Sequence, residues 1–281
     1  MTAMRRGLAV PCFAEDPREL IDLGIEAERA GFDGFFLWDH IVFADSGEGP
    51  PIVDPWQVLA VVAASTSRIR IGTLITPVPR RRPWQLAKET TTLDRLSGGR
   101  LTLGVGIGSP AHGDFGIFHE PTDERVRAEL LDEGLDVLAG LWTGEQFSLR
   151  GQHFTVDPVR FSPRPVQQPR IPVWVGGVLP APRPVARSAR WDGMVPIRYS
   201  GGSLARVSAG EIAAVRDQVA AARGSVDGFD LVIWAEVEQA QGDVDAVAPA
   251  YEDAGATWWI ESARPQPGWW EGVTARVARG L

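Results

Sequence analysis

Residues 16–38 read DPRELIDLGIEAERAGFDGFFLW, a helix-forming segment followed at once by a short apolar run. Asp16 and Pro17 are residue types that begin helices, and Leu20 and Leu23 recur at the spacing of one helical face. The run that follows lacks polar–apolar alternation, which is typical of a parallel strand buried on both faces. This stretch therefore predicts one helix–strand unit of an α/β protein.

The same alternation continues along the whole chain of 281 residues. Helix-start chemistry recurs at Asp54-Pro55, Pro83, Asp123 and Ser208. Eight apolar runs are expected to form strands: 6–13, 33–38, 69–76, 101–107, 171–175, 193–197, 231–237 and 257–261. Weaker helix-like segments lie at 187–191, before Gly255 and at 269–279, and a small hairpin turning near Gly151 is expected after the fourth helix. Eight strands alternating with helices predict a single (β/α)8 TIM barrel domain over residues 1–281.

An open, doubly wound sheet is the alternative fold. The dinucleotide-like sequence Gly104-Val-Gly106-Ile-Gly108 lacks the final glycine of the Rossmann fingerprint. Pro110 and a loop follow it where a helix should begin. The barrel is therefore the favoured prediction.

Composition narrows the classes of function. The net charge of −8 argues against nucleic acid as a partner, because phosphate neutralisation requires a basic face. No apolar run approaches the roughly 20 residues of a membrane helix, and we expect a cytoplasmic protein without a membrane partner. Cys12 is the only cysteine, the four histidines lack metal-ligand spacing, and Lys88 is the only lysine. We therefore expect no disulfide framework, no metal site and no catalytic lysine elsewhere.

Function in a barrel gathers at the carboxyl ends of the strands. The sequence Trp38-Asp39-His40 places an acid and an imidazole just past the second strand. A histidine can move a proton near neutral pH, and a neighbouring carboxylate can fix its tautomer or bind a ligand hydroxyl. The structural alternative is an aspartate that caps the loop and a histidine that packs under it.

Three further features have both a functional and a structural interpretation. Gly176-Gly177 could offer backbone N–H groups to a phosphate, helped by Arg183 and Arg187, or simply form a turn. Glycines 104, 106 and 108 suit a flat ring lying against the backbone, or a crowded barrel corner. The run at 80–82 is three arginines, which are either solvated or meet an anionic cofactor tail or substrate.

Four segments together resemble the luciferase-like monooxygenase family: residues 32–40, 68–77, 93–101 and 169–177. Members of this family, the bacterial luciferase superfamily, are flavin- or deazaflavin-dependent oxidoreductases with a (β/α)8 fold. The resemblance is specific through about residue 195, and beyond that only the strand–helix rhythm agrees.

The resemblance implies that a flavin or deazaflavin ring lies in the barrel mouth. It implies a non-prolyl cis peptide bulge at Leu74-Ile75 behind the ring. It also implies that the phosphate end meets the backbone around Gly176-Gly177. The cofactor-binding residues it implies are Asp39, Leu74, Ile75, Ile107, Gly108, Val175, Gly176 and Gly177.

The Trp-Asp-His sequence resembles the branch of the family that uses coenzyme F420, whereas the FMN branch more often has Glu-His-His there. In the F420 branch the aspartate, here Asp39, contacts the deazaflavin hydroxyl, and the histidine, here His40, lies beside the reacting ring. The expected reaction is hydride transfer between C5 of F420 and a small, rather apolar organic substrate, with His40 shuttling the proton. FMN-dependent oxygen insertion is the first alternative, and a catalytically silent flavin-binding barrel is the second.

Departures from the family pattern bear on the substrate and partners. Deazaflavin-dependent sugar-phosphate dehydrogenases have a glutamate where this chain has Ser109, and they use lysines that this chain lacks. A sugar phosphate is therefore disfavoured, and His112 and Asp114 are the candidates for the missing acid. Trp56 and Phe115 are expected to line an apolar mouth. The family also implies a homodimer and, for some members, a separate flavin or F420 reductase.

Overall fold

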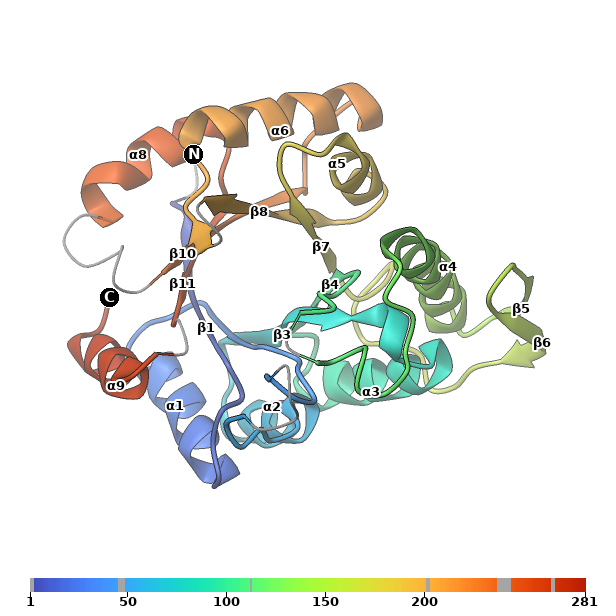
Figure 1. Cartoon of the computed structure of the whole chain (residues 1–281), viewed down its shortest axis with the longest axis horizontal. Helices are drawn as coiled ribbons and strands as arrows, with labels where there is room; N and C mark the ends of the chain where they lie inside the picture. Colours follow the sequence, from blue (N-terminus) through green and yellow to red (C-terminus); the bar gives the residue numbers. More distant parts are fainter. Residues whose placement is uncertain (1–2, 45–48, 112, 201–202, 237–243, 264–265) are drawn as a thin grey trace.

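Eight parallel strands form a closed barrel in the computed structural model of the chain (Figure 1). The structure describes residues 3–44, 49–111, 113–200, 203–236, 244–263 and 266–281. The barrel strands are β1 (Arg5–Val10), β2 (Gly34–Leu37), β3 (Arg70–Pro77), β4 (Leu101–Gly106), β7 (Val173–Val178), β8 (Gly193–Ser200), β10 (Asp230–Glu236) and β11 (Trp258–Ser262). Pairing of β8 with β10 closes the sheet. Each of the eight predicted runs overlaps one of these strands, so the predicted (β/α)8 fold is confirmed.

Helices cover the outside of the barrel (Figure 1). They are α1 (Pro17–Arg29), α2 (Pro55–Ser65), α3 (Pro83–Leu96), α4 (Glu124–Trp142), α5 (Pro182–Ser188), α6 (Ala209–Arg223), α8 (Val244–Ala254) and α9 (Trp269–Arg279). The carboxylates of Asp16, Asp54 and Asp123 each accept a backbone N–H in the first turn of their helix, as the sequence predicts. The helix expected over 187–191 was misplaced, because Pro182 starts α5 five residues earlier.

Three aromatic rings fill the inside of the barrel. Phe36 lies 5.4 Å from Trp174 and 6.1 Å from Trp258, and the two tryptophans are 5.3 Å apart between ring centroids. Gly34 leaves room for them, because a Cβ there would lie 2.6 Å from the Phe36 ring. The barrel is therefore a packed core, and a ligand must bind at its mouth.

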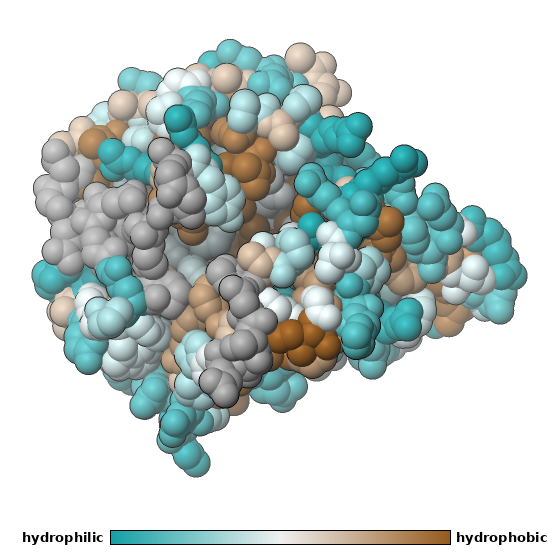
Figure 2. All heavy atoms as spheres, viewed as in Figure 1, coloured by the Kyte–Doolittle hydropathy of each residue, from teal (hydrophilic) through white to brown (hydrophobic). Residues whose placement is uncertain are grey.

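The predicted hairpin after the fourth helix is present as β5 (Gln146–Arg150) and β6 (Thr155–Arg160). Phe147 packs against Gly140 of α4, where a Cβ would lie 2.1 Å from its ring. Figure 1 shows the hairpin projecting away from the barrel, and Figure 2 shows mainly hydrophilic residues along the outer edge of this face.

A second hairpin was not predicted. Strand β9 (Ser203–Ala205) pairs antiparallel with the end of β8. It brings Leu204 and Ala205 to the mouth of the barrel. Among the described residues, none of the helices has the length and apolar character needed to cross a membrane.

Candidate active site

His40 and Asp114 form a hydrogen-bonded pair at the barrel mouth. His40 follows β2, Asp114 follows β4, and their Nδ1 and Oδ2 atoms lie 2.6 Å apart. The other oxygen of Asp114 accepts the backbone N–H groups of Ile41 and Val42 at 2.8 and 3.1 Å. An ionised carboxylate only accepts, so it fixes the proton on Nδ1. Within the described part of the chain, the opposite ring nitrogen, Nε2, has no hydrogen-bond partner.

Asp114 is ionised near neutral pH. Burial alone would raise the pKa of its carboxyl, but the hydrogen bond from His40 and the nearby charge of Arg80 lower the pKa below its ordinary value. The sequence predicted Asp114 as a candidate for the missing acid. The structure instead places it where it orients His40. The other candidate, His112, lies outside the described residues.

Asp39 precedes His40 in the chain and is 2% exposed. One carboxylate oxygen accepts from Arg80 and Arg81, both at 2.9 Å, and the other accepts from Thr76 at 2.8 Å and from Arg81 at 3.1 Å. Arg80 also donates to the backbone carbonyl of Asp39. Burial raises the pKa of Asp39, but the charges of Arg81 and Arg80 lower it below its ordinary value. Asp39 is therefore a buried carboxylate clamped by two guanidinium groups.

This clamp changes the interpretation of two sequence features. The side chain of Arg80 is 2% exposed and that of Arg81 is 18% exposed, so these two arginines are not solvated as a loop run usually is. Both oxygens of Asp39 are already engaged, so a cofactor hydroxyl would have to displace Thr76 or an arginine. The predicted contact between Asp39 and F420 is not tested by this arrangement and stays a prediction.

Arg80 connects the two carboxylates. It follows β3 in a single 3-10 turn, η1 (Val78–Arg80), and its side chain is buried. Its Nη2 lies 2.9 Å from Asp39 and 3.9 Å from Asp114. The clamp and the His40–Asp114 pair therefore form one charged network.

The floor of the mouth is built around Ile75. The Leu74-Ile75 peptide is cis, as the resemblance implied, and β3 and β4 shift register there. The side chain of Ile75 lies over two glycines. A Cβ added at Gly106 would lie 3.2 Å from the Ile75 side chain, and one added at Gly176 would lie 2.1 Å from it. The structure therefore brings together Ile75 and Gly176, two of the predicted cofactor-binding residues.

Gly176 and Gly177 do not form a turn, which was the structural alternative to a phosphate site. Both lie inside β7, which runs to Val178 and pairs with β8. A Cβ on Gly177 would lie 2.2 Å from Pro184 of α5. These glycines make room for neighbouring side chains. Arg187 pairs with Asp132 of α4 at 2.6 Å, so it does not add charge at the glycines.

Arg127 holds the loop after β4, a role that its sequence position did not indicate. It is 3% exposed and donates to the carbonyl groups of Ile107 and Gly108 at 3.1 and 2.5 Å. Gly108 has a φ of 71°, a conformation that favours glycine. Helical spacing alone placed Arg127 on α4 without showing that it reaches this loop.

The remaining predicted residues are buried. Leu74 lies inside the barrel, whereas Val175 packs outward against the helices. Trp56 and Phe115, expected to line the mouth, are also buried; the indole of Trp56 lies 3.4 Å from Asp39. Glu261 at the end of β11 points away from the mouth and pairs with Arg6 and Arg276.

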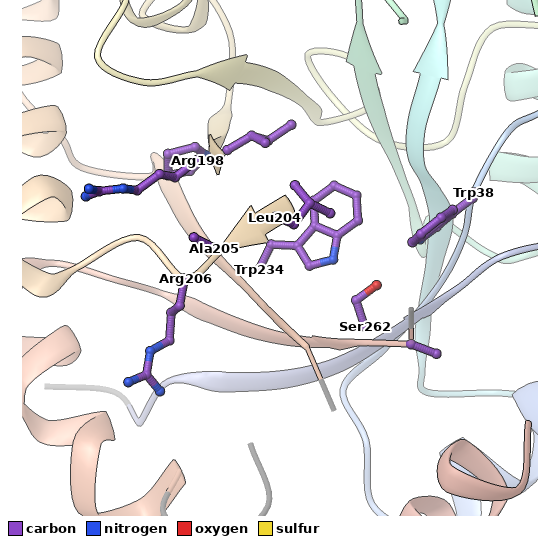
Figure 3. Close-up of a pocket in the computed structure, with 10 residues that line it drawn as sticks. Trp38, Arg198, Leu204, Ala205, Arg206, Trp234 and Ser262 are labelled. Carbon is purple, nitrogen blue, oxygen red and sulfur yellow. The ribbon is translucent and has the colours of Figure 1, made fainter. Parts of the chain in front are cut away.

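The pocket at the mouth has a different lining (Figure 3). It lies between the ends of β2, β8, β9, β10 and β11 and opens to solvent. Its lining is Trp38, Pro196, Ile197, Arg198, Leu204, Ala205, Arg206, Trp234, Ser262 and Ala263. Val232 and Ile260 point into the barrel, and Trp234 and Ser262 come two residues after them in the same strands. Because side chains two residues apart share a face of a strand, this alternation could have predicted that Trp234 and Ser262 point inward.

The family model described as luciferase-like monooxygenase matches residues 3–272. The chain belongs to this family. Its (β/α)8 barrel, the cis peptide in β3 and the histidine after β2 are the features that the resemblance implied.

Curated relatives of this luciferase-like chain include F420-dependent glucose-6-phosphate dehydrogenases. The protein from Nakamurella multipartita is 30% identical over 223 residues, which are 79% of this chain and 63% of the relative. The one from Microbacterium testaceum is 34% identical over 168 residues, 59% of this chain and 48% of the relative. The chain thus spans about half to two thirds of the length of these relatives.

Solved structures share the luciferase-like fold. An F420-dependent secondary alcohol dehydrogenase, in complex with an F420-acetone adduct, has a TM-score of 0.76 at 16% identity, with 98% of each chain covered. The monooxygenase RslO1 from Streptomyces bottropensis has a TM-score of 0.69 at 22% identity, again with 98% of each chain covered. At these identities the likeness establishes the fold alone.

Proposed function

We propose that the chain is an F420-dependent oxidoreductase that transfers a hydride to or from a small, rather apolar organic substrate. The observation that carries this proposal is the His40–Asp114 pair at the mouth of a luciferase-like barrel. Nδ1 of His40 lies 2.6 Å from Oδ2 of Asp114. Curated relatives include F420-dependent glucose-6-phosphate dehydrogenases, which favours F420 over FMN. When bound, F420 supplies a deazaflavin ring that carries two electrons as a hydride.

His40 is the proposed proton carrier. Its Nε2 would take the proton of a substrate hydroxyl during oxidation and return it during reduction. Asp114 would hold the ring in the tautomer with Nδ1 protonated and would stabilise the imidazolium that forms. Arg80 would keep Asp114 ionised through its charge.

The residues of the floor are proposed to position the cofactor. Ile75 lies over Gly106 and Gly176, and the backbone of Ile107 and Gly108 is fixed by Arg127. In this proposal Asp39 does not contact the cofactor, because both of its carboxylate oxygens already accept hydrogen bonds. Its role is to hold Arg80 in place.

The substrate is proposed not to be a sugar phosphate. Lys88 is engaged on the outside of the barrel, where it donates to the carbonyl of Ser162 at 2.9 Å. Ser109, at the position of the family's glutamate, is exposed. The lining of the mouth pocket is mainly apolar, which suits a compact alcohol or ketone.

A binding titration tests the cofactor. Purified protein is titrated separately with F420 and FMN while the fluorescence of each ring is followed, and we expect F420 to bind more tightly. Stronger binding of FMN would favour a monooxygenase fed by a separate flavin reductase, and binding of neither would favour a silent barrel. The homodimer implied by the family is tested by sedimentation of the same sample.

A turnover assay tests the role of His40. The F420-loaded protein is mixed with short secondary alcohols, and reduction of F420 is followed by the loss of its visible absorbance. His40→Gln is expected to keep F420 affinity and to lower kcat by about 10²-fold to 10⁴-fold. Equal turnover by the variant would contradict the proposal.

A further inference from the structure

Three polar groups of the mouth pocket have no hydrogen-bond partner. They are the indole N–H groups of Trp38 and Trp234 and the hydroxyl of Ser262, each shielded from solvent. In Figure 3 the Ser262 hydroxyl points toward the space between the two indole rings, and the nitrogen of Trp234 lies on the side that faces Ser262. The two rings are in edge contact, with centroids 6.0 Å apart.

Such groups are costly to leave unpaired. A buried polar group without a partner costs roughly 1–3 kcal/mol, so most buried donors in folded proteins are paired. Trp38, Trp234 and Ser262 come from three different strand ends and meet in one pocket. Their convergence indicates a binding site whose ligand completes the hydrogen bonds.

The chemistry of the three groups defines the ligand. An indole N–H can only donate, and a serine hydroxyl can donate. Arg198 and Arg206 line the same pocket, and none of its ten described lining residues carries a carboxylate. The ligand must therefore present at least one oxygen that accepts hydrogen bonds from these groups.

We propose that this pocket binds a small organic compound through a carbonyl or carboxylate oxygen, held by Trp38, Trp234 and Ser262. Its apolar body contacts Ile197 and Leu204. The identification of this compound as the substrate rests on the proposed function, whereas the binding site itself does not. The ring of Trp38 lies 6.1 Å from that of His40, so the pocket adjoins the proposed proton carrier.

The site is tested by ¹H–¹⁵N spectroscopy of the indole groups, which needs no turnover. The full chain, with and without F420, is titrated with hexanoate, with methyl pentyl ketone and with hexylamine. The resonances of Trp38 and Trp234, assigned from Trp38→Phe and Trp234→Phe, are expected to shift with hexanoate or the ketone and not with the amine. Tighter binding of hexanoate than of the ketone would show that Arg198 and Arg206 contribute.

Variants separate hydrogen bonding from packing. Ser262→Ala removes one donor with little change in volume and is expected to weaken binding about fivefold, as the loss of one hydrogen bond does. Trp191→Phe is the matched control for Trp38→Phe and Trp234→Phe. The Trp191 indole is also unpaired, but it lies away from the pocket against Arg170 and Arg190. The control is expected to leave binding unchanged.

Two results would overturn the inference. One is equal binding of hexylamine and hexanoate, and the other is the absence of any shift at Trp38 and Trp234 with either oxygen compound. If F420 binds but the oxygen compounds do not, the pocket assignment fails and the proposed function stands. If the oxygen compounds bind but F420 does not, the proposed function fails and the pocket stands.

Discussion

Asp114 acts on His40 through a single short contact. Replacing its carboxylate by an amide in Asp114→Asn removes the charge that fixes the Nδ1 proton and stabilises the imidazolium. We expect kcat to fall roughly 10²-fold or more, with F420 affinity nearly unchanged, and turnover and fluorescence titrations measure the two.

Asp157→Asn is the control for this substitution, because Asp157 lies on the β5–β6 hairpin and is 79% exposed. It should leave kcat unchanged. A kcat near the wild-type value in Asp114→Asn would show that Asp114 does not position a catalytic histidine.

Asp39 is expected to matter for stability more than for cofactor contact. Asp39→Asn leaves the guanidinium groups of Arg80 and Arg81 underpaired in a buried position. Breaking such a network costs about 3–5 kcal/mol, which urea unfolding measures. Asp157→Asn, whose partner Arg150 is also exposed, should give no measurable change. Equal stability of wild type and Asp39→Asn would contradict the clamp.

The same carboxylate sets a pH dependence. The pKa of Asp39 is lowered in the folded protein, whereas the unfolded chain titrates near about 3.9. The unfolded state therefore binds more protons between these two values, and the stabilisation is full above roughly pH 5 and is lost as the pH falls through the folded pKa. We expect wild type to lose more free energy of unfolding than Asp39→Asn between about pH 6 and pH 3. Parallel losses would show that the pKa is not lowered.

At the scale of elements, Glu133 joins α4 to the hairpin. Its carboxylate accepts the backbone N–H groups of Gln152, His153 and Phe154 at 3.0, 2.9 and 2.6 Å. Glu133→Ala leaves these three amides without their acceptor, so we expect faster hydrogen exchange there and little change in the barrel strands. Glu145→Ala is the control, because exposed Glu145 faces Arg160 at 3.5 Å. Uniform acceleration throughout the chain would instead show that the hairpin and the barrel unfold as one unit.

At the scale of the whole molecule, closure of the barrel depends on how closely β3 and β4 approach. A Cβ at Gly72 would lie 1.8 Å from the carbonyl oxygen of Thr102, so Gly72→Ala must push the two strands apart. We expect a loss of at least about 3 kcal/mol in urea unfolding.

Gly272→Ala is the matched change in α9, where nothing lies within 4 Å of the new Cβ. It should stabilise the protein by about 0.5–1 kcal/mol, because alanine favours the helix. If both alanine variants behave alike, strand spacing does not limit the stability of the barrel.

The amino-acid sequence by itself determined the barrel and the position of His40. Strands buried on both faces are continuous apolar runs, and helix starts such as Asp16-Pro17 are local signals, so both are visible without tertiary contacts. The motif around residues 32–40 likewise placed His40 just past a strand, where the barrel puts its mouth.

Only the tertiary structure decided which groups meet there. Arg80 reaches Asp39 across 41 residues of sequence and Asp114 reaches His40 across 74, and both contacts arise because the carboxyl ends of parallel strands converge when the sheet closes. The inward or outward direction of Ser262 and Glu261 depends on strand register, since neighbouring side chains point to opposite faces. The spacing of residues in the sequence predicts where the strands lie. It does not predict which side chains come within hydrogen-bonding distance when the sheet closes into a barrel.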